Sequence, residues 1–400
     1  MPTSQKDLGV TRHTLLALVG GSPQIVSESI YALFKHRNIV INDIKIVTTS
    51  SCKEKISKAL LEPKDNGFTI LEKLTQDYDL PPIQFEENDI WVPKSSCGNT
   101  ISDVTTAKEM NAIAQCLLDN IKRLTSCESQ VLHASLAGGR KTMTFYLSYA
   151  MSIFARPQDT LSHVFVSPDF EHCDFFYPTP YKNKINTVHG VLNSQVAHVT
   201  LSNIPYVQLR PSLPKRFLTH PISIKDTELV FEIINRPLSL DISVTSCELI
   251  CSGVKVKLTK ANMAFYLIMV DDLLNGHEGF DCPSTSDKTL AILYIEKRLK
   301  IEGKEYKLEN LKNAIYVIEN KHLILKDSEV EGLRHGLKKS FFTDRKNQIS
   351  QALRNELPEN IAEHYDIDSL SKSYKKSDGK NKNFNYFGIN IDQSIVRFIG

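Results

Sequence analysis

Residues 131–142, VLHASLAGGRKT, contain the pattern most indicative of the architecture of the first half of the chain. Residues 131–137 form an apolar run of strand length, and two glycines separate it from a strongly apolar helical stretch over 142–154. Glycine tolerates backbone conformations and close approaches that other residues do not. The stretch therefore predicts a strand, a tight turn and a helix in immediate succession.

A second pattern of the same kind lies near the N-terminus, where the strand-like run TLLALV (14–19) is followed by GGSPQ and an apolar helix over 25–34. Further strands are predicted at 44–49 and 162–168, and further helices at 53–62 and 102–124. Such alternation is typical of an α/β protein with a Rossmann-like, doubly wound parallel sheet. Because ligands of such sheets bind beyond the carboxyl ends of the strands, both glycine turns are expected at the ligand-binding edge.

The second half of the chain has a different character. Prolines 205, 211 and 214 suggest a linker, so we expect two domains, at 1–204 and 205–400. Short strands with a turn at Ser252-Gly253 precede a helix that Thr259 can cap, and a later helix over 343–355 begins at Thr343 or Asp344. Residues 374–398 are predicted to form a hairpin with a basic tip. This order predicts a winged helix-turn-helix-like domain with insertions.

Overall charge and composition exclude several classes of protein. The 400 residues carry 48 Lys+Arg against 46 Asp+Glu, a formal net charge of +2, so any site for a polyanion must be local. No apolar run reaches the length of a membrane helix, and the first residues lack the apolar core of a secretory signal. The eight cysteines include no C-x-x-C pair. We therefore expect a cytoplasmic protein with reduced thiols and without membrane contact, bound metal or cofactor.

Both glycine turns have the chemistry of an anion site. Backbone N–H groups and the dipole at a helix start favour a negative group, and Pro23 suits a first helical turn. The first turn lacks the G-x-G-x-x-G spacing of dinucleotide-binding proteins, and the second lacks the register of a Walker loop. Arg140 and Lys141 would repel the positive end of the helix dipole unless an anion is bound. A polyanionic ligand accounts for this arrangement.

Two segments carry a resemblance to a known family. VGGSPQIVSESIYAL (19–33) and HASLAGGRKTMTFYLSYAMSIFARPQDTLSHVFVSP (133–168) resemble the CRISPR-associated Rossmann-fold (CARF) proteins. More narrowly, the chain is similar to the subfamily that joins a CARF domain to a winged-helix domain, whose members are ring nucleases. The resemblance implies binding of cyclic oligoadenylates, the second messengers of type III CRISPR antiviral defence, and cleavage of those rings.

The resemblance also implies roles for individual residues. Ser22 and Lys141 match positions that contribute to binding and cleavage in ring nucleases, and we take them as the catalytic pair. The positions expected to bind the ligand are Gly20, Gly21, Gln24, Ser135, Gly138, Gly139, Arg140 and Thr142. A 2′-hydroxyl of the ring would attack the adjacent phosphate, without a metal, and leave a 2′,3′-cyclic phosphate. Cyclic tetra-adenylate is the favoured ligand and cyclic hexa-adenylate the rival, because the region 63–100 could change the width of the pocket. A near-symmetric ring also implies a two-fold homodimer.

The sequence is also compatible with an alternative function, a cyclic-oligoadenylate-responsive transcription regulator without cleavage activity. DNA would bind through the winged helix, whose basic residues are Arg345, Lys346, Arg354, Lys375, Lys376, Lys380 and Lys382. An effector ribonuclease is disfavoured, because its R-x4–6-H pattern occurs only at Arg156–His163, inside the first half.

Two other groups of residues contain side chains that can take part in catalysis or metal binding. His133 lies on a buried-type strand, where a core role is more common than proton transfer. The polar cluster at 171–174, EHCD, lacks the spacing of a zinc site.

Overall fold

A computed structural model describes residues 11–399 of the chain, except for 65, 96, 277–278, 321, 324 and 376–380. The chain divides into two compact units, each described by itself below. The first extends to Pro211 and includes Pro221–Thr227, and the second consists of Ser212–His220 and the residues from Glu228 onward. No helix in these described ranges is both long and apolar enough to span a membrane.

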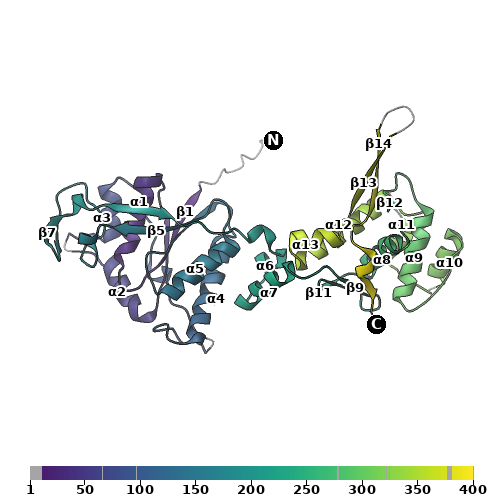
Figure 1. The fold of residues 1–400 in the computed structure, drawn as a ribbon, viewed down its shortest axis with the longest axis horizontal. Coiled ribbons are helices and arrows are strands. Elements are labelled where there is room, and N and C mark those ends of the chain that lie inside the picture. Colours follow the sequence, from purple (N-terminus) through teal and green to yellow (C-terminus); the bar gives the residue numbers. More distant parts are fainter. Residues whose placement is uncertain are drawn as a thin grey trace. The chain divides into compact units, whose positions relative to one another are not determined.

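A six-stranded sheet forms the centre of the first unit (Figure 1), with the strand order β3-β2-β1-β4-β5-β8. Its strands are β1 (Arg12–Leu18), β2 (Asp43–Val47), β3 (Ile90–Trp91), β4 (Gln130–Ser135), β5 (Thr160–Val166) and β8 (Val199–Asn203). All neighbouring pairs are parallel except β5 and β8. The predicted α/β fold with a parallel sheet is thus confirmed, and the antiparallel edge strand is an addition that the alternation did not predict.

Helices cover both faces of this sheet, which explains why the inner part of its central strand, Leu15–Leu18, is apolar. Residues 15–19 are at most 1% exposed, as expected for a parallel strand buried on both sides. The helices are α1 (Gln24–Arg37), α2 (Ser50–Leu60), α3 (Ile70–Asp77), α4 (Ala107–Leu124) and α5 (Lys141–Phe154). Helix α4 packs beside α5, and α3 beside α1. A separate hairpin is formed by β6 (Lys184–Thr187) and β7 (Gly190–Asn193).

The second unit combines two small sheets with a helical core. One sheet has the order β11-β10-β9-β15 and the other β12-β14-β13. The strands are β9 (Leu240–Ser243), β10 (Glu248–Cys251), β11 (Val254–Lys257), β12 (Phe280–Asp281), β13 (Ile367–Lys375), β14 (Asn381–Ile389) and β15 (Val396–Phe398). The helices are α6 (Lys215–Thr219), α7 (Ile224–Ile234), which begins in the first unit, α8 (Lys260–Leu274), α9 (Lys288–Ile301), α10 (Leu311–Glu319), α11 (Asp327–Leu333), α12 (Lys339–Glu356) and α13 (Glu359–Tyr365).

Several local predictions for this unit can be compared with the structure. Ser252 and Gly253, both with positive φ, make the turn between β10 and β11, and Thr259 caps α8 through a hydrogen bond from the Asn262 N–H. The predicted start of the later helix at Thr343 or Asp344 is wrong, because α12 begins at Lys339. Phe342, inside that first turn, is buried, so packing extends the helix beyond the polar residues that marked its start. The tip residues Lys376 and Lys380 lie outside the described residues.

Candidate functional site

The two glycine turns meet at the centre of the sheet. Strands β1 and β4 are parallel neighbours, and the strands that follow them continue outward on opposite sides. This is the topological switch point at which doubly wound sheets bind ligands. A Cβ on Gly20 would lie 3.6 Å from both Cα and N of Gly139, so the two backbones approach each other closely, with room for about one carbon atom between them. The expectation that both turns share one edge of the sheet is confirmed.

Close packing makes glycine a requirement in the second turn. A Cβ on Gly138 would lie 2.5 Å from the carbonyl oxygen of Leu18 and 2.4 Å from Cδ1 of Ile25. Gly139 has φ +80°, a backbone conformation that strains residues with a side chain. These two glycines let the turn after β4 lie directly against the end of β1.

The replacement Gly138→Ala should therefore lower the free energy of unfolding by about 1–3 kcal/mol, as other overpacked sites do. Gly21→Ala is the matched control, because its Cβ would meet nothing within 4 Å. The single tryptophan, Trp91, lies in β3, so urea denaturation followed by its fluorescence reports on this sheet. Equal stability of the two variants would contradict the close contact between the turns.

Three helices that begin at this edge have no side-chain cap among the described residues. Pro23, Thr49 and Arg140 occupy the N-cap positions of α1, α2 and α5, and none accepts a backbone hydrogen bond through its side chain. In contrast, α4 begins with a full capping box between Thr106 and Glu109. Uncapped helix starts leave N–H donors at the positive end of the helix dipole, which is where anions bind.

The cations at the second turn differ in their surroundings. Arg140 forms a bidentate ion pair with Asp103, which lowers the pKa of that carboxyl group through hydrogen bonding. One of the two cations predicted to need an anion is therefore already neutralised by a residue of the chain. Lys141, the first residue of α5, is exposed and forms no ion pair within the described ranges. Lys55 of α2 adds a third cation, because its ammonium donates to the carbonyl oxygen of Gly21 at 2.5 Å.

Two cavities flank the first glycine turn. The turn cavity, of about 260 Å³, is lined by Val19, Gly20, Gly21, Thr49, Ser51, Cys52, Asp103, Gly139, Arg140 and Met143. The carboxyl cavity, of about 200 Å³, is lined by Ser22, Gln24, Ile25, Glu28, Ala137, His163, Val164, Phe165, Val166, Phe170, Glu171, His172, Cys173 and Phe175. Because Gly21 and Ser22 are consecutive, one ligand can reach both cavities across the turn.

The predicted site residues other than Ser135 fall into four groups in this structure. Gly20, Gly21, Gly139 and Arg140 line the turn cavity, and Ser22 and Gln24 line the carboxyl cavity. Lys141 and Thr142 are exposed at the start of α5 and line neither cavity. Gly138 packs against Leu18 and Ile25 and also lines neither cavity.

Ser135 is the exception to the expected arrangement. It is 1% exposed, and its hydroxyl contacts that of Ser29 at 3.2 Å. Ser135 thus joins β4 to α1 beneath the turn, because the last residue of a doubly covered strand points into the core. It is not placed to contact a ligand.

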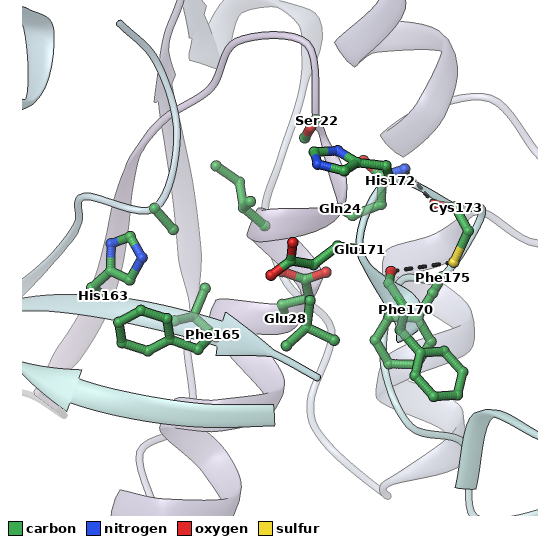
Figure 2. Close-up of a pocket in the computed structure, with 14 residues that line it drawn as sticks. Ser22, Gln24, Glu28, His163, Phe165, Phe170, Glu171, His172, Cys173 and Phe175 are labelled. Carbon is green, nitrogen blue, oxygen red and sulfur yellow. Dashed lines mark hydrogen bonds between the residues drawn. The ribbon is translucent and has the colours of Figure 1, made fainter. Parts of the chain in front are cut away.

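Sequence reasoning missed Glu28 and considered Glu171 and His172 only as part of a zinc site, although all three line the carboxyl cavity. Figure 2 shows Glu28 and Glu171 with their carboxyl groups toward the same space and His172 beside Ser22. Burial, and secondarily the negative charge of Glu171, raises the pKa of Glu28 to about 7. The available signal was SES (27–29) on the buried side of α1, three consecutive polar residues of which none is more than 6% exposed.

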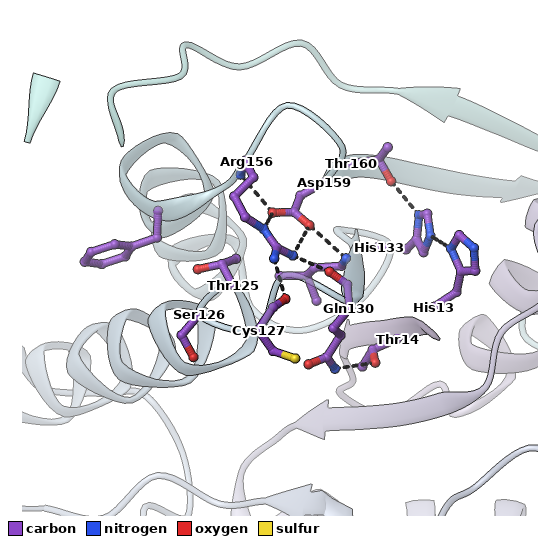
Figure 3. Close-up of polar contacts among 12 residues, drawn as sticks. His13, Thr14, Thr125, Ser126, Cys127, Gln130, His133, Arg156, Asp159 and Thr160 are labelled. Carbon is purple, nitrogen blue, oxygen red and sulfur yellow. Dashed lines mark hydrogen bonds and ion pairs between the residues drawn. The ribbon is translucent and has the colours of Figure 1, made fainter. Parts of the chain in front are cut away.

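Other polar groups that the sequence brought into consideration serve the fold. His133 contacts His13 at 2.9 Å and Thr160 at 2.8 Å, and burial followed by the proximity of His13 lowers the pKa of His133 to about 4 (Figure 3). Arg156 is buried in an ion pair with Asp159. No set of three or more His, Cys, Asp or Glu side chains in the described part of the chain is arranged to hold a metal ion.

The fold and the paired turns define an α/β protein with a doubly wound sheet and a candidate ligand site at its switch point. The particular family follows from comparison of the sequence. The pattern of the CRISPR-associated protein NE0113 family matches residues 22–238, more than half of the chain. The protein therefore belongs to this CRISPR-associated family. No curated protein matches the chain.

Two solved structures show limited similarity. A type III CRISPR defence DNA nuclease activated by cyclic oligoadenylate is 12% identical, with a TM-score of 0.23, over 81% of this chain and 36% of the nuclease. A protein provisionally assigned as a UDP-N-acetylglucosamine 2-epimerase from Listeria monocytogenes is 14% identical, with a TM-score of 0.20, over 39% of this chain and 31% of its own. The chain spans about a third of the length of these structures.

Proposed function

We propose that the protein is a ring nuclease that binds a cyclic oligoadenylate across the two glycine turns and opens the ring. The observation that carries the proposal is the close approach of Gly20 and Gly139 at the switch point, with the uncapped starts of α1, α2 and α5 around it. Backbone N–H groups in this arrangement suit a chain of phosphates. Membership of a CRISPR-associated family supports a ligand from that defence system.

In the proposed reaction the 2′-oxygen of one ribose attacks the adjacent phosphorus while the bond to the 5′-oxygen breaks. The 2′-hydroxyl loses its proton, the 5′-oxygen gains one, and the product is linear with a 2′,3′-cyclic phosphate. Holding the attacking and leaving oxygens in line supplies up to about 7–11 kcal/mol in favourable intramolecular reactions. Ser22 would orient the ribose or phosphate, and Lys141 would stabilise the charge that develops on the phosphate.

The proposed contact set is narrower than the one expected from sequence. Gly20, Gly21, Gly139 and Thr142 remain proposed ligand contacts through the turns and the start of α5. Arg140 can contribute after exchange from Asp103, whereas Ser135 is left out because of its burial. A ring with near-symmetry would lie on the two-fold axis of a homodimer, so that each chain supplies one copy of the turns.

The second unit is proposed to be a winged-helix domain. The order α8, β12, α9, α12 and the hairpin β13–β14, with α10 and α11 inserted before α12, α13 inserted after it and β12 paired to β14, supports this assignment. Three of the four basic residues of α12 make contacts within the unit. Arg354 pairs with Glu359 and Asp366, Arg345 donates to Asn262, and Lys346 lies over the ring of Phe387. These contacts favour the nuclease over the DNA-binding regulator.

The proposal is tested by incubating the pure protein with labelled cyclic tetra-adenylate and cyclic hexa-adenylate in EDTA and separating the products by chromatography. We expect the tetra-adenylate to be opened to linear species with a 2′,3′-cyclic phosphate. Preferential opening of the hexa-adenylate would identify that ring as the preferred substrate and would leave the proposed reaction unchanged. Tight binding without turnover would favour the regulator, and the absence of binding to either ring would overturn the proposal.

A further inference from the structure

Glu28 is a buried carboxyl group without a partner. It is 6% exposed, lines the carboxyl cavity, and forms no hydrogen bond or ion pair with any residue that the structure describes. Buried carboxyl groups are ordinarily paired or hydrogen-bonded, because removing them from water is otherwise unfavourable. Because Glu28 lines the cavity, a molecule bound there would be placed to form the hydrogen bonds that the protein does not provide.

The titratable groups that line the cavity with Glu28 include no lysine or arginine that could neutralise its charge. Glu171, His172 and Cys173 come from the segment after β5, and His163 comes from β5 itself. Glu171 repels a charged Glu28, and burial acts in the same direction, so the pKa of Glu28 rises to about 7. The neutral carboxylic acid is therefore a substantial form near neutral pH, and it carries one donor and one acceptor.

A second unpartnered polar atom lies in the same cavity. The side-chain nitrogen of Gln24 donates to the carbonyl oxygen of Cys173 at 3.1 Å, which fixes the amide, while its oxygen Oε1 is buried without a partner. Two aromatic rings line another side of the cavity. Phe165 is 52% exposed, and its ring centroid lies 4.3 Å from that of His163. Figure 2 shows these rings on the β5 side of the cavity and Gln24 on the α1 side.

We propose that the carboxyl cavity binds one adenine base of the ligand, with the neutral carboxylic acid of Glu28 donating to a ring nitrogen and accepting from the exocyclic amine. The second N–H of that amine would be accepted by Oε1 of Gln24. The cavity volume of about 200 Å³ equals that of roughly six or seven water molecules, which suits a single flat base and not a whole ring. The proposal rests on the proposed function, because Ser22 links this cavity to the turn that would hold the phosphate.

The test is equilibrium binding of a ring that cannot be cleaved. Cyclic tetra-2′-deoxyadenylate lacks the attacking hydroxyl, and its phosphodiesters do not titrate between pH 6 and 9. The affinity of the wild-type protein should fall about tenfold for each pH unit above 7, because the acid form of Glu28 becomes correspondingly scarcer. In the Glu28→Gln variant the amide donates and accepts at every pH, so the affinity should stay constant from pH 7 to 9.

Two controls connect the pH dependence to base recognition. The corresponding hypoxanthine ring, which lacks the exocyclic amine, should bind at least about tenfold more weakly, since it leaves buried acceptors unpaired. Glu28→Ala should bind weakly at every pH. A Glu28→Gln variant that keeps the wild-type pH profile would assign the titration to His163, His172 or Cys173 and overturn the inference.

The folded state gives an independent check that Glu28 titrates as stated. With a folded-state pKa of about 7 against an ordinary value near 4.5, the folded protein binds more protons than the unfolded chain between these values. The contribution of Glu28 to stability is thus complete below pH 4.5 and is lost as the pH rises through 7. Urea denaturation at pH 6 and 8 should show this loss in the wild-type protein, and Glu28→Gln should lack it.

The outcomes separate this inference from the proposed function. If the deoxyadenylate ring binds without pH dependence or base preference, only the inference is overturned. If no ring binds at any pH, the proposed function is overturned, and saturation-transfer NMR with adenosine then decides on the cavity. An adenosine signal at pH 6 that disappears at pH 9, and persists in Glu28→Gln, would support the inference, and no signal would overturn it.

Discussion

Replacement of Asp159 by alanine is expected to lower the free energy of unfolding by about 3–5 kcal/mol, the usual cost of breaking a buried ion pair on one side. Asp159 is 3% exposed and accepts hydrogen bonds from the guanidinium of Arg156 and from the backbone N–H groups of Arg156 and Leu132, at 2.8–2.9 Å. Figure 3 shows this network between the start of β4 and the turn before β5. Without Asp159, the buried guanidinium of Arg156 keeps only the carbonyl oxygens of Cys127 and Gln130 and loses its counter-charge, and two buried backbone N–H groups lose their acceptor.

Urea denaturation followed by the fluorescence of Trp91 measures this loss in the first unit. Asp159→Asn should lose less than Asp159→Ala, because the amide oxygen still accepts from the backbone, and it serves if the alanine variant does not fold. Glu54→Ala, which removes an exposed i,i+4 pair with Lys58, is the control and should leave the midpoint unchanged. A loss below about 1 kcal/mol for Asp159→Ala would show that Arg156 finds another partner or water.

Lys141→Ala is expected to slow ring opening by about 10²–10³-fold, the usual effect of removing one group that stabilises transition-state charge. Lys141 is the first residue of α5, beside the second glycine turn, and its charge is not neutralised by an ion pair within the described residues. The measurement is single-turnover cleavage of cyclic tetra-adenylate in EDTA. It rests on the proposed function.

The matched control for Lys141 is Lys108→Ala, which removes an exposed lysine from the first turn of α4, where a capping box already occupies the N–H groups. Lys108→Ala should leave cleavage unchanged. Stability separates a chemical from a structural role, because removing a lysine from the positive end of a helix dipole should leave α5 equally or slightly more stable. A Lys141→Ala variant with full cleavage activity would exclude the proposed role for this residue.

Prediction from sequence succeeded for features that depend on neighbouring residues. The apolar runs before Gly20 and Gly138 become β1 and β4, and the paired glycines become turns at one edge of the sheet. The argument that two adjacent cations require an anion was incomplete. Asp103, which neutralises Arg140, lies 37 residues away and comes from an irregular segment before α4. No local pattern links these two positions.

The candidate site likewise combines residues that the sequence predicted with residues that only long-range contacts bring there. Gln24 was predicted to reach a ligand, yet its amide nitrogen is held by the carbonyl of Cys173, 149 residues later, and only Oε1 remains unpaired. Glu28 was not predicted to take part, although it lies one helical turn beyond Gln24. Its burial depends on the packing of α1 against β5 and β8, which the spacing of apolar residues along α1 does not specify.

Local patterns in the sequence were enough to predict the alternation that became β1, α1, β2, α2, α4, β4, α5 and β5, the parallel sheet and the position of both glycine turns, whereas α3, β3 and the antiparallel strand β8 were not predicted. These features follow from apolar periodicity and from the backbone freedom of glycine, which act over a few residues. Only the tertiary structure decided that Ser135 turns into the core, that Asp103 neutralises Arg140, and that Glu28 faces Glu171 across a cavity. Each of these depends on contacts between residues distant in the chain, and burial and charge are set by such contacts.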